Sequence, residues 1–289
     1  MIKIRNVLLV IVGLLLISSL TLFFFYDLEI SKLLVNENPH FLFVLLAAIG
    51  EFPIYIGPIL FGLVYGFTNK EKWSKLFSHF VGLLATYIAC TRLCNGILEE
   101  FYHSQFGLVQ ELLLTVASLI TYVLLTMVVA HVDKSRLEKL RGVSLLGLLV
   151  SITSFSLVSG MKVLWGRMRF RSLSEGYSEY TNFLTINGIS KLSLTDDYQS
   201  FPSGHTNSAS CVLILIPLFK ILNNKKWINW LVIGTTSIYT LVVGISRICV
   251  GAHYASDVLI GFSVFVISYL LVKYVLKKKG WLDVRSDKC

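Results

Sequence analysis

The amino-acid sequence predicts an all-α protein, a polytopic bundle of about eight transmembrane helices. The 289 residues are 55% hydrophobic and only 15% charged, and the mean hydropathy of +0.71 is typical of membrane proteins rather than soluble domains. Apolar runs long enough to cross about 30 Å of hydrocarbon recur along the chain. Basic residues gather in the short loops between these runs, as they do in membrane proteins of fixed orientation.

The apolar runs predict the helices in order. They lie at 7–25, 41–67, 76–98, 110–131, 143–162, 205–222, 228–247 and 254–276. The first run lacks the short apolar core and small-residue cleavage site of a signal peptide, so we interpret it as an uncleaved helix. The second is overlong and carries Glu51, Pro53 and Pro58, which predicts a kink or a short interfacial break. No internal repeat is visible, and the chain is expected to form one membrane domain, 1–289.

The loop charges predict the orientation. Basic residues precede the first run, follow the last and occupy every second loop: Lys3, Arg5, Lys70, Lys72, Lys75, Lys134, Arg136, Lys139, Arg141, Lys220, Lys225, Lys226, Lys277, Lys278 and Lys279. The alternate loops are neutral or acidic, with Asp27 and Glu29 after the first run and Glu99 and Glu100 after the third. Both termini are therefore expected in the cytoplasm of a multi-pass protein of the cell membrane. The net charge of +9 reflects this topology, and a nucleic-acid partner is not expected.

Three polar groups of residues stand at ends of the apolar runs. They are Lys162 with Arg169, then Pro202-Ser203-Gly204-His205, and then Ser246-Arg247 with His253 and Asp257. The predicted topology places all three on the extracytoplasmic face, where they can form one site. Ionisable groups are costly in a membrane, so they are functional candidates. The long stretch 170–201 lies on the same face and is expected to be either a functional loop over the site or a solvated flap with a short hairpin or helix.

These residue types suit the transfer of a phosphoryl group. Such a transfer needs cations on the non-bridging oxygens, an in-line nucleophile and an acid for the departing oxygen. Lys162, Arg169 and Arg247 can supply the cations, although any one alone would more often extend into the headgroup layer. Ser203 and Gly204 precede a predicted helix whose free amides favour an anion, although Pro-Ser-Gly by itself is an ordinary turn.

Two histidines complete the set. His205 opens the sixth run and His253 opens the eighth. One histidine at a membrane boundary is more often a hydrogen-bonded interface residue, but two on one face beside phosphate-binding residue types predict a nucleophile and an acid. Asp257 follows His253 by four residues, so on a helix the two would share a face. The carboxylate could then accept from one ring nitrogen and leave the other free to attack.

The order and spacing of these residues resemble a known signature. Lys162-x6-Arg169, Pro202-Ser203-Gly204-His205 and Ser246-Arg247-x5-His253-x3-Asp257 are similar to the three motifs of the type 2 phosphatidic acid phosphatase superfamily. That superfamily includes undecaprenyl pyrophosphate phosphatases, phosphatidylglycerophosphate phosphatases, acid phosphatases and vanadium haloperoxidases. The resemblance covers roughly 145–275. Phe170 stands where the first motif usually has proline, and the N-terminal part adds about two helices to the usual six.

The resemblance implies a role for each residue. His253 would be the nucleophile that forms a phosphohistidine, Asp257 would orient it, and His205 would protonate the leaving group and later activate water. The phosphate oxygens would be held by Lys162, Arg169, Ser203, Gly204 and Arg247. The resemblance also implies a six-helix phosphatase core. It implies no metal and no cofactor, because cations and amides take their place.

We therefore expect a membrane lipid phosphatase, a metal-independent hydrolase of the cell envelope. Its substrate would be a lipid phosphomonoester or pyrophosphate at the outer leaflet. Undecaprenyl pyrophosphate is the first candidate, and phosphatidic acid or phosphatidylglycerophosphate the second. The alternatives are a lipid phosphotransferase, in which an acceptor other than water takes the phosphoryl group, and a noncatalytic lipid-binding or transport protein. A haloperoxidase is disfavoured because known members are soluble.

The remaining polar residues are weaker signals. Cys90 and Cys94 lie one helical turn apart with His79 before them, but no further zinc-type ligand accompanies them, so a metal site is not expected. Glu51 and Arg92 are expected either to pair structurally or to line an entrance for the headgroup. Arg167 is expected to add a phosphate contact or to pair with a loop carboxylate.

Overall fold

The described chain consists of α-helices joined by loops and 3₁₀ turns. The structure is a computed structural model that describes residues 2–36, 38–102, 107–223 and 225–282, with the side chains of 2–10, 12 and 99–102 outside the description. The charged side chains of Lys3, Arg5, Glu99 and Glu100 therefore lie outside it. The α-helices are α1 (Ile2–Leu34), α2 (Phe41–Ile49), α3 (Ile56–Thr68), α4 (Lys72–Tyr102), α5 (Leu108–Ala130), α6 (Lys134–Trp165), α7 (Gly204–Ser210), α8 (Leu215–Leu222), α9 (Lys226–Cys249) and α10 (Ala255–Lys278). The 3₁₀ turns are η1 (Phe52–Tyr55), η2 (Phe170–Ser172), η3 (Leu192–Leu194), η4 (Asp196–Tyr198) and η5 (Cys211–Ile214).

Within the described ranges there is no strand, which confirms the predicted all-α class. Eight helical segments of these ranges are long and apolar enough to cross a membrane, as predicted, and the protein is a multi-pass membrane protein. The first segment differs from its prediction, because α1 continues through Asp27 and Glu29 to Leu34. Asp27 is fully buried and ion-paired, so its charge does not end the helix.

Two of the crossings are interrupted. In the second crossing, α2 ends at Ile49, Gly50 and Glu51 form a turn, and η1 leads into α3. Pro53 fits near the start of η1, where its missing N–H costs no hydrogen bond, and the predicted break is confirmed. The sixth crossing is likewise built from α7, η5 and α8. The first break brings Glu51 Oε1 to 3.5 Å from His205 Nδ1.

Glycines let the central helices approach closely. A Cβ on Gly57 of α3 would lie 2.3 Å from the carbonyl carbon of Gly147 in α6, and one on Gly62 would lie 2.4 Å from Cα of Gly82 in α4. No real side chain fits at such distances, so α3 contacts both neighbours through backbone, as small-residue contacts between membrane helices do. An apolar core that includes Val143, Val150 and Ile214 fills the space beside this contact.

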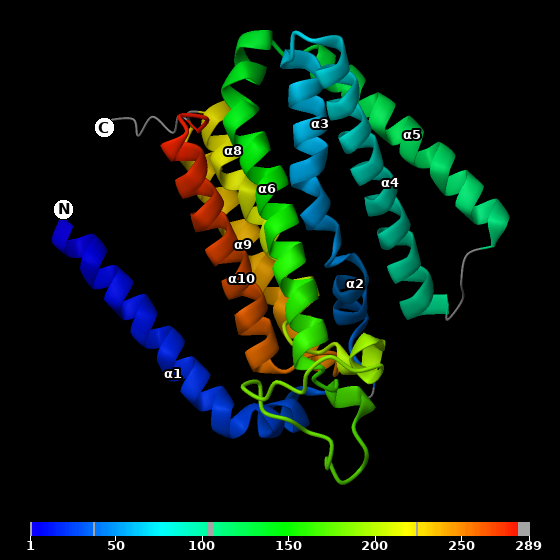
Figure 1. Ribbon diagram of the computed structural model, residues 1–289, viewed down its shortest axis with the longest axis vertical. Helices are drawn as coiled ribbons and strands as arrows, with labels where there is room; N and C mark the ends of the chain where they lie inside the picture. Colours follow the sequence, from blue (N-terminus) through cyan, green and yellow to red (C-terminus); the bar gives the residue numbers. More distant parts are fainter. Residues whose placement is uncertain (1, 37, 103–106, 224, 283–289) are drawn as a thin grey trace.

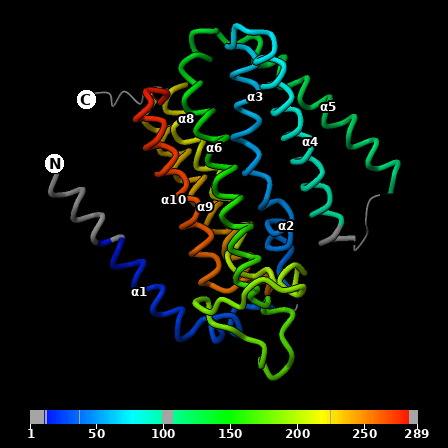
Figure 2. The backbone as a smooth tube through the Cα atoms, in the orientation of Figure 1, coloured from blue at the N-terminus to red at the C-terminus, as the bar shows by residue number. Residues whose placement is uncertain are grey.

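The bundle has a compact centre and two diverging helices. In Figure 1, α3, α6, α9 and α10 run side by side, whereas α1 and α5 lean away from them. The tube in Figure 2 shows the same divergence of the backbone, with α1 approaching the bundle only near its C-terminal end. That end of the bundle is also where residues 170–201 lie.

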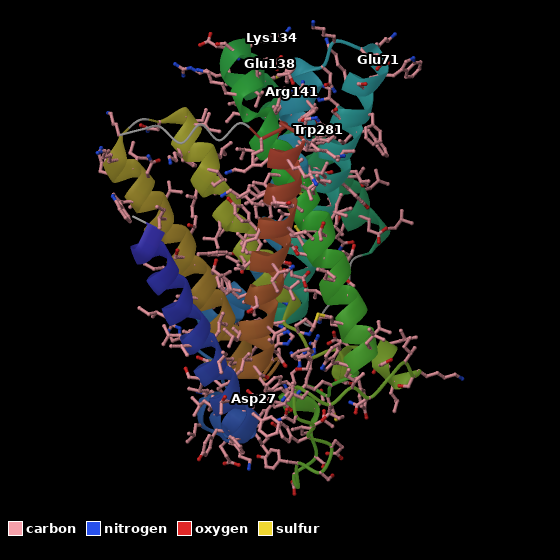
Figure 3. The ribbon with its side chains drawn as sticks, turned by 60° about the vertical axis from the view of Figure 1, so that its left-hand side comes forward. Asp27, Glu71, Lys134, Glu138, Arg141 and Trp281 are labelled. Carbon is pink, nitrogen blue, oxygen red and sulfur yellow. The ribbon has the colours of Figure 1, made fainter. Side chains whose placement is uncertain are left out.

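The two ends of the bundle carry different polar groups. Lys134, Glu138 and Arg141 gather where α6 begins, and Asp27 lies at the opposite end (Figure 3). Arg141 Nη1 donates to Thr68 Oγ1 at 2.6 Å and so joins the start of α6 to the end of α3. The three polar groups identified in the sequence all lie at the Asp27 end, which we call the site end.

Residues 170–201 cover the site end. They contain η2, η3 and η4 and irregular backbone. Both ends of this segment are fastened to the bundle, since Arg171 N donates to Gly251 O at 2.9 Å and Ser200 N donates to Arg167 O at 3.0 Å. The loop is thus tied to the connection between α9 and α10, and its role as a lid remains a prediction.

Candidate active site

The three motifs meet at the site end. Lys162 lies in the last turn of α6, Ser203 caps α7, and His253 lies between α9 and α10. Gly166 ends α6 with a φ of +52°, a conformation that glycine adopts without strain, and the chain then turns back over the site. Ser203 N donates to Asp257 O at 2.9 Å, so the backbone itself joins the second motif to the third.

Lys162 reaches the start of α7. Its Nζ donates to the carbonyl oxygen of Gln199 at 2.7 Å. A Cβ on Gly204 would lie 3.5 Å from Lys162 Cε and 3.9 Å from Nζ. The ammonium group and the start of α7 therefore lie side by side, and both favour a negative ligand at the same place.

Two arginines of the predicted phosphate site are buried beside it. Arg169 is 6% exposed and Arg247 is 3% exposed. Arg169 Nη2 pairs with Asp196 Oδ1 at 2.6 Å, but the Asp196 side chain is 68% exposed, so solvent screens this ion pair. The carbonyl oxygen of Arg247 accepts the N–H of His253 at 3.1 Å. The end of α9 thereby positions the histidine.

Ser203 is held in place by its own helix and by α10. Its Oγ accepts Thr206 N at 3.3 Å and Thr206 Oγ1 at 2.9 Å, an N-cap arrangement. With both acceptor positions in use, the hydroxyl hydrogen is left to donate to a ligand. Gly261 of α10 allows this placement, because a Cβ there would lie 2.4 Å from Ser203 O.

His253 is fully buried and fixed in one tautomer. Its Nδ1 lies 2.6 Å from Ser200 O, and because a carbonyl oxygen only accepts, Nδ1 carries the hydrogen and Nε2 the lone pair. Burial, together with the charges of Lys162, Arg169 and Arg247, lowers the pKa of the ring to about 3. Among the described residues, Nε2 has no hydrogen-bond partner. The ring is thus neutral and oriented, with its lone pair available.

Asp257 lies beside His253, with Ser200 between them. Asp257 Oδ2 is 3.7 Å from His253 Nδ1 but accepts Ser200 Oγ at 2.5 Å and Tyr254 N at 2.9 Å. The sequence prediction that His253 and Asp257 share a helix face is wrong, because α10 begins only at Ala255. Ser200 contacts the histidine with its carbonyl and the aspartate with its hydroxyl. Sequence reasoning missed it, since a loop serine that acts through its backbone carries no pattern.

His205 faces His253 across the site. The two ring centroids are 6.5 Å apart, and the His205 side chain is 19% exposed, which leaves it open to the substrate side. Glu51 Oε1 lies 3.5 Å from His205 Nδ1. Glu51 thus faces a proposed catalytic group. Its two expected roles, structural pairing or lining an entrance, stay predictions.

A buried ion cluster lies behind Asp257. Arg167 Nη1 donates to Asp257 Oδ1 at 2.6 Å and Nη2 donates to Asp27 Oδ2 at 2.9 Å. All three side chains are fully buried. Arg167 therefore pairs with carboxylates of two helices, α1 and α10, and not with a carboxylate of the loop, which corrects that part of the sequence expectation. The available signal was Asp27 itself, an acidic residue directly after an apolar run.

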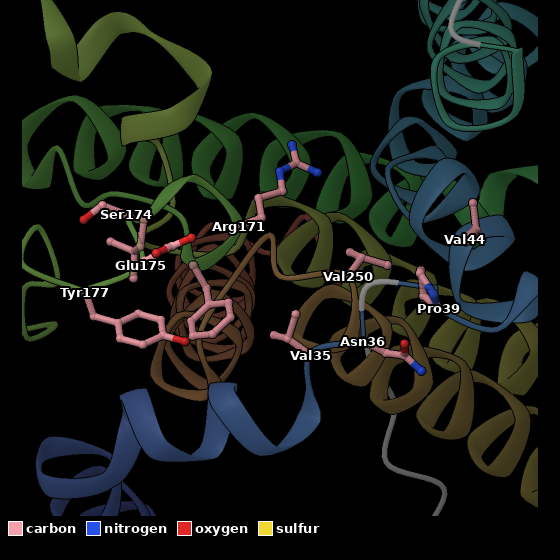
Figure 4. Close-up of a pocket in the computed structure, with 11 residues that line it drawn as sticks. Val35, Asn36, Pro39, Val44, Arg171, Ser174, Glu175, Tyr177 and Val250 are labelled. Atoms are coloured by element: carbon pink, nitrogen blue, oxygen red, sulfur yellow. The ribbon is translucent and has the colours of Figure 1, made fainter.

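A pocket of about 460 Å³ opens next to the site. Figure 4 shows Arg171, Glu175 and Tyr177 of the loop on one side, and Asn36 and residues around it on the other. Its walls also include Val250, at the end of α9. One wall of the pocket thus belongs to the segment that carries His253. The lining contains both apolar and charged groups.

The sequence predicts no metal site at His79, Cys90 and Cys94. In the part of the chain that the structure describes, no three His, Cys, Asp or Glu side chains are placed to hold one metal ion. Cys90 and Cys94 are free thiols, and His79 Nδ1 lies 3.1 Å from Tyr122 Oη. His79 thus joins α4 to α5.

Comparison with known proteins identifies the C-terminal half. The sequence model of the PAP2 superfamily matches residues 144–281, which contain the three motifs and all the site residues predicted from the sequence. We call residues 144–281, which match this model, the PAP2 region. The PAP2 region begins in α6 and ends just after α10, so α1 to α5, with Asp27 and Glu51, lie outside it.

Three relatives align with parts of the chain. Phosphatidylglycerophosphatase B of Bacillus subtilis is 38% identical over 79 residues, 26% of this chain and 37% of the relative. Bacitracin transport permease protein BcrC of Bacillus licheniformis is 36% identical over 108 residues, 37% of this chain and 48% of the relative. Phosphatidylglycerophosphatase B of Haemophilus influenzae is 27% identical over 187 residues, 56% of this chain and 77% of the relative. The chain thus spans less than half of the first two relatives, and no solved structure matches it.

Proposed function

We propose that this protein is a membrane lipid phosphatase that works through a phosphohistidine. The observation that carries the proposal is Nε2 of His253, a buried and unprotonated nitrogen without a hydrogen-bond partner in the described chain. Three cations and a second histidine surround the space next to it. A nitrogen lone pair that is buried without a partner is costly to maintain, and nucleophilic attack gives it a use.

In the first step, Nε2 of His253 forms a bond to phosphorus. The bond from phosphorus to the leaving-group oxygen breaks, and protonated His205 gives its proton to that oxygen. Lys162, Arg169 and Arg247 offset the charge on the non-bridging oxygens, while Ser203 donates its hydroxyl hydrogen. The 6.5 Å between the two rings suits a phosphoryl group that is attacked from one side and protonated on the other.

In the second step, water attacks the phosphorus atom of the phosphohistidine. Neutral His205 takes a proton from that water, the bond between phosphorus and Nε2 breaks, and the electron pair returns to the ring. Inorganic phosphate leaves, and His205 is again protonated. In this scheme cations and hydroxyl donors do the charge stabilisation, so the reaction is proposed to be independent of metal.

The substrate is proposed to be a lipid phosphate. All the site residues lie at one end of a bundle of membrane-spanning helices, and the loop charges favour the extracytoplasmic face. Undecaprenyl pyrophosphate remains the first candidate on the ground of this orientation. Two relatives carry the name phosphatidylglycerophosphatase B, which supports phosphatidylglycerophosphate as the strongest competitor, ahead of phosphatidic acid.

The test is phosphate release by detergent-purified protein in the presence of EDTA. The substrates are undecaprenyl pyrophosphate, phosphatidylglycerophosphate, phosphatidic acid and a soluble phosphomonoester. His253→Ala and His205→Ala are expected to lose about a thousandfold or more in turnover. His79→Ala is the matched control, because it also removes a histidine, but one that lies in α4, away from the site. Full turnover by His253→Ala would sink the phosphohistidine mechanism.

A lipid phosphotransferase is the second candidate, and the pocket beside the site favours it. A cavity of about 460 Å³ next to the segment of His253 can seat an acceptor that takes the phosphoryl group in place of water. The two functions differ in their products. A phosphatase releases inorganic phosphate from every substrate that it consumes, whereas a transferase consumes the lipid phosphate only with an acceptor alcohol and yields a new phosphate ester.

A further inference from the structure

The buried ion cluster joins the N-terminal helix to the catalytic end. Asp27 comes from α1, Arg167 from the segment after α6, and Asp257 from α10. All three side chains have no exposed surface, and Figure 3 shows Asp27 near the lower end of α1. The reaction proposed above makes no use of Asp27. Burial of a carboxylate is costly unless it is paired, so its presence needs a reason.

Every contact of the Asp27 carboxylate comes from a donor. Oδ2 accepts from Arg167 Nη2 at 2.9 Å and from Ser256 Oγ at 2.5 Å, and Oδ1 accepts from Ser256 N at 3.0 Å. Hydrogen bonds donated to a carboxylate favour its ionised form. The cluster of Asp27, Arg167 and Asp257 therefore carries two negative charges and one positive charge.

Arg167 is fixed between the two carboxylates. Its Nε donates to Thr181 O at 2.9 Å and its Nη1 also donates to Ser256 Oγ at 2.9 Å. The guanidinium carbon lies 3.9 Å from the centroid of the Tyr254 ring, a cation–π distance. These contacts hold the guanidinium group in place, so it cannot rotate to pair with Asp257 alone. Its charge is shared between the two acids.

This sharing matters when His253 is phosphorylated. The ring gains positive charge as Nε2 bonds to phosphorus, because Nδ1 keeps its hydrogen. Asp257 Oδ2 is a negative group 3.7 Å from Nδ1. If Arg167 paired with Asp257 alone, the pair would be neutral. With Asp27 also paired to Arg167, one net negative charge remains near the ring.

We infer that Asp27 is a positioning residue of the active site. It holds Arg167 so that Asp257 keeps both its place and its net charge behind His253, and α1 is thereby part of the catalytic apparatus although most of its length stands apart from the bundle. This inference rests on the proposed phosphohistidine function. It assigns a role to a residue outside the PAP2 region.

The experiment compares Asp27→Asn with wild type in the full-length protein. Asn keeps the size of the side chain and removes the charge. Single-turnover mixing with a ³²P-labelled lipid substrate measures the rate of phosphohistidine formation, and steady-state assays give kcat and KM. Carboxylates behind metal-binding histidines are worth about 10- to 100-fold, and we expect phosphorylation to slow by a similar factor with KM little changed. An unchanged phosphorylation rate would overturn the inference.

Ser31→Ala is the matched control. Ser31 is fully buried one turn further along α1, and its Oγ donates to the backbone carbonyl of Asp27 at 3.0 Å. Its removal perturbs the same helix contact without changing charge, and we expect the wild-type phosphorylation rate. A loss in Ser31→Ala equal to that in Asp27→Asn would show that helix packing, not the charge, is responsible, and would also overturn the inference.

A second pair guards against failure of Asp27→Asn to fold. Asp27→Glu and Asp27→Gln have the same length and differ only in charge. Faster phosphorylation in the Glu variant supports the inference, and equal rates contradict it. The proposed function fails separately, when wild-type protein neither forms a phosphoenzyme nor releases phosphate. Wild-type turnover with no effect of the charge at position 27 rejects the positioning role alone.

Discussion

The PAP2 region and the helices before it contribute different charged groups to the site. The PAP2 region supplies Asp257 and the three cations that are proposed to hold the phosphate, Lys162, Arg169 and Arg247. The preceding helices supply two carboxylates, and each faces a basic group of the PAP2 region: Asp27 faces Arg167 and Glu51 faces His205. The part that matches the family thus carries the groups that would touch phosphate. The part that does not match supplies two carboxylates that pair with basic groups of the PAP2 region.

The two parts are also held together differently. Within the apolar 18-residue stretch of the span that contains α6, 44% of the residues are buried inside the protein, against 6% for the corresponding stretch of α1. A helix with so few buried residues depends on individual contacts for its position. For α1 these contacts include Asp27 and Ser31, which are both fully buried. Polar contacts thus position α1, whereas apolar packing positions α6.

Loss of Arg167 should have the largest effect, because it removes the link between the two parts. Arg167→Gln leaves Asp27 and Asp257 buried without their cation, and breaking a buried ion pair costs about 3–5 kcal/mol. We expect thermal unfolding in detergent to show a loss of that order, with phosphate release abolished. Adding Asp27→Asn should restore part of the stability, since one uncompensated charge disappears. A double variant no more stable than Arg167→Gln would show that the two parts are not coupled through this cluster.

Replacement of Lys162 tests the PAP2 part alone. Lys162→Met removes one cation from the phosphate position and keeps most of the side-chain volume. Loss of a preorganised charge that stabilises a transition state typically costs about 10²–10³-fold, and we expect such a decrease in kcat/KM for phosphate release. Lys134→Met, an exposed lysine at the other end of α6, is the control and should behave as wild type. Similar losses in both variants would argue for a general effect of charge on α6.

The buried histidine predicts how stability depends on pH. The pKa of His253 is about 3 in the folded protein, against an ordinary value of 6.5. Between these values the unfolded chain binds a proton that the folded protein does not, so stability falls as the pH drops below 6.5, by up to about 1.4 kcal/mol per pH unit. From pH 7 to pH 5, the melting temperature of the wild type should fall more than that of His253→Gln. Equal decreases would contradict a neutral buried ring.

Glu51 should give the smallest effect, and it tests the contribution of the earlier helices. Glu51→Gln keeps the shape but removes the negative charge 3.5 Å from His205 Nδ1. At water-like screening this charge stabilises protonated His205 by about 1 kcal/mol, so kcat at pH 7 should fall roughly fivefold. Glu51→Asp, which shortens the side chain but keeps the charge, should lose less than Glu51→Gln. Equal losses in the two variants would assign Glu51 a structural role.

The sequence predicts what is local and misses what joins distant segments. Apolar length predicts the eight crossings, and motif spacing predicts which residues gather at the site end. The pairing of Asp27 with Arg167 spans 140 residues, and no periodicity reports such a contact. For the same reason the end of α1 was placed too early, since an acid normally ends an apolar span and its buried partner is invisible in one dimension. Ser200 acts on His253 through a carbonyl, which every residue type possesses.

The members of the ion cluster are synthesised at different times. Asp27 is synthesised 140 residues before Arg167, an interval of roughly 7 to 28 s at the usual speed of ribosomes. During that time the guanidinium group that pairs with Asp27 in the folded protein does not yet exist. The attachment of α1 through Asp27 is therefore complete only after the segment with Arg167 has been made.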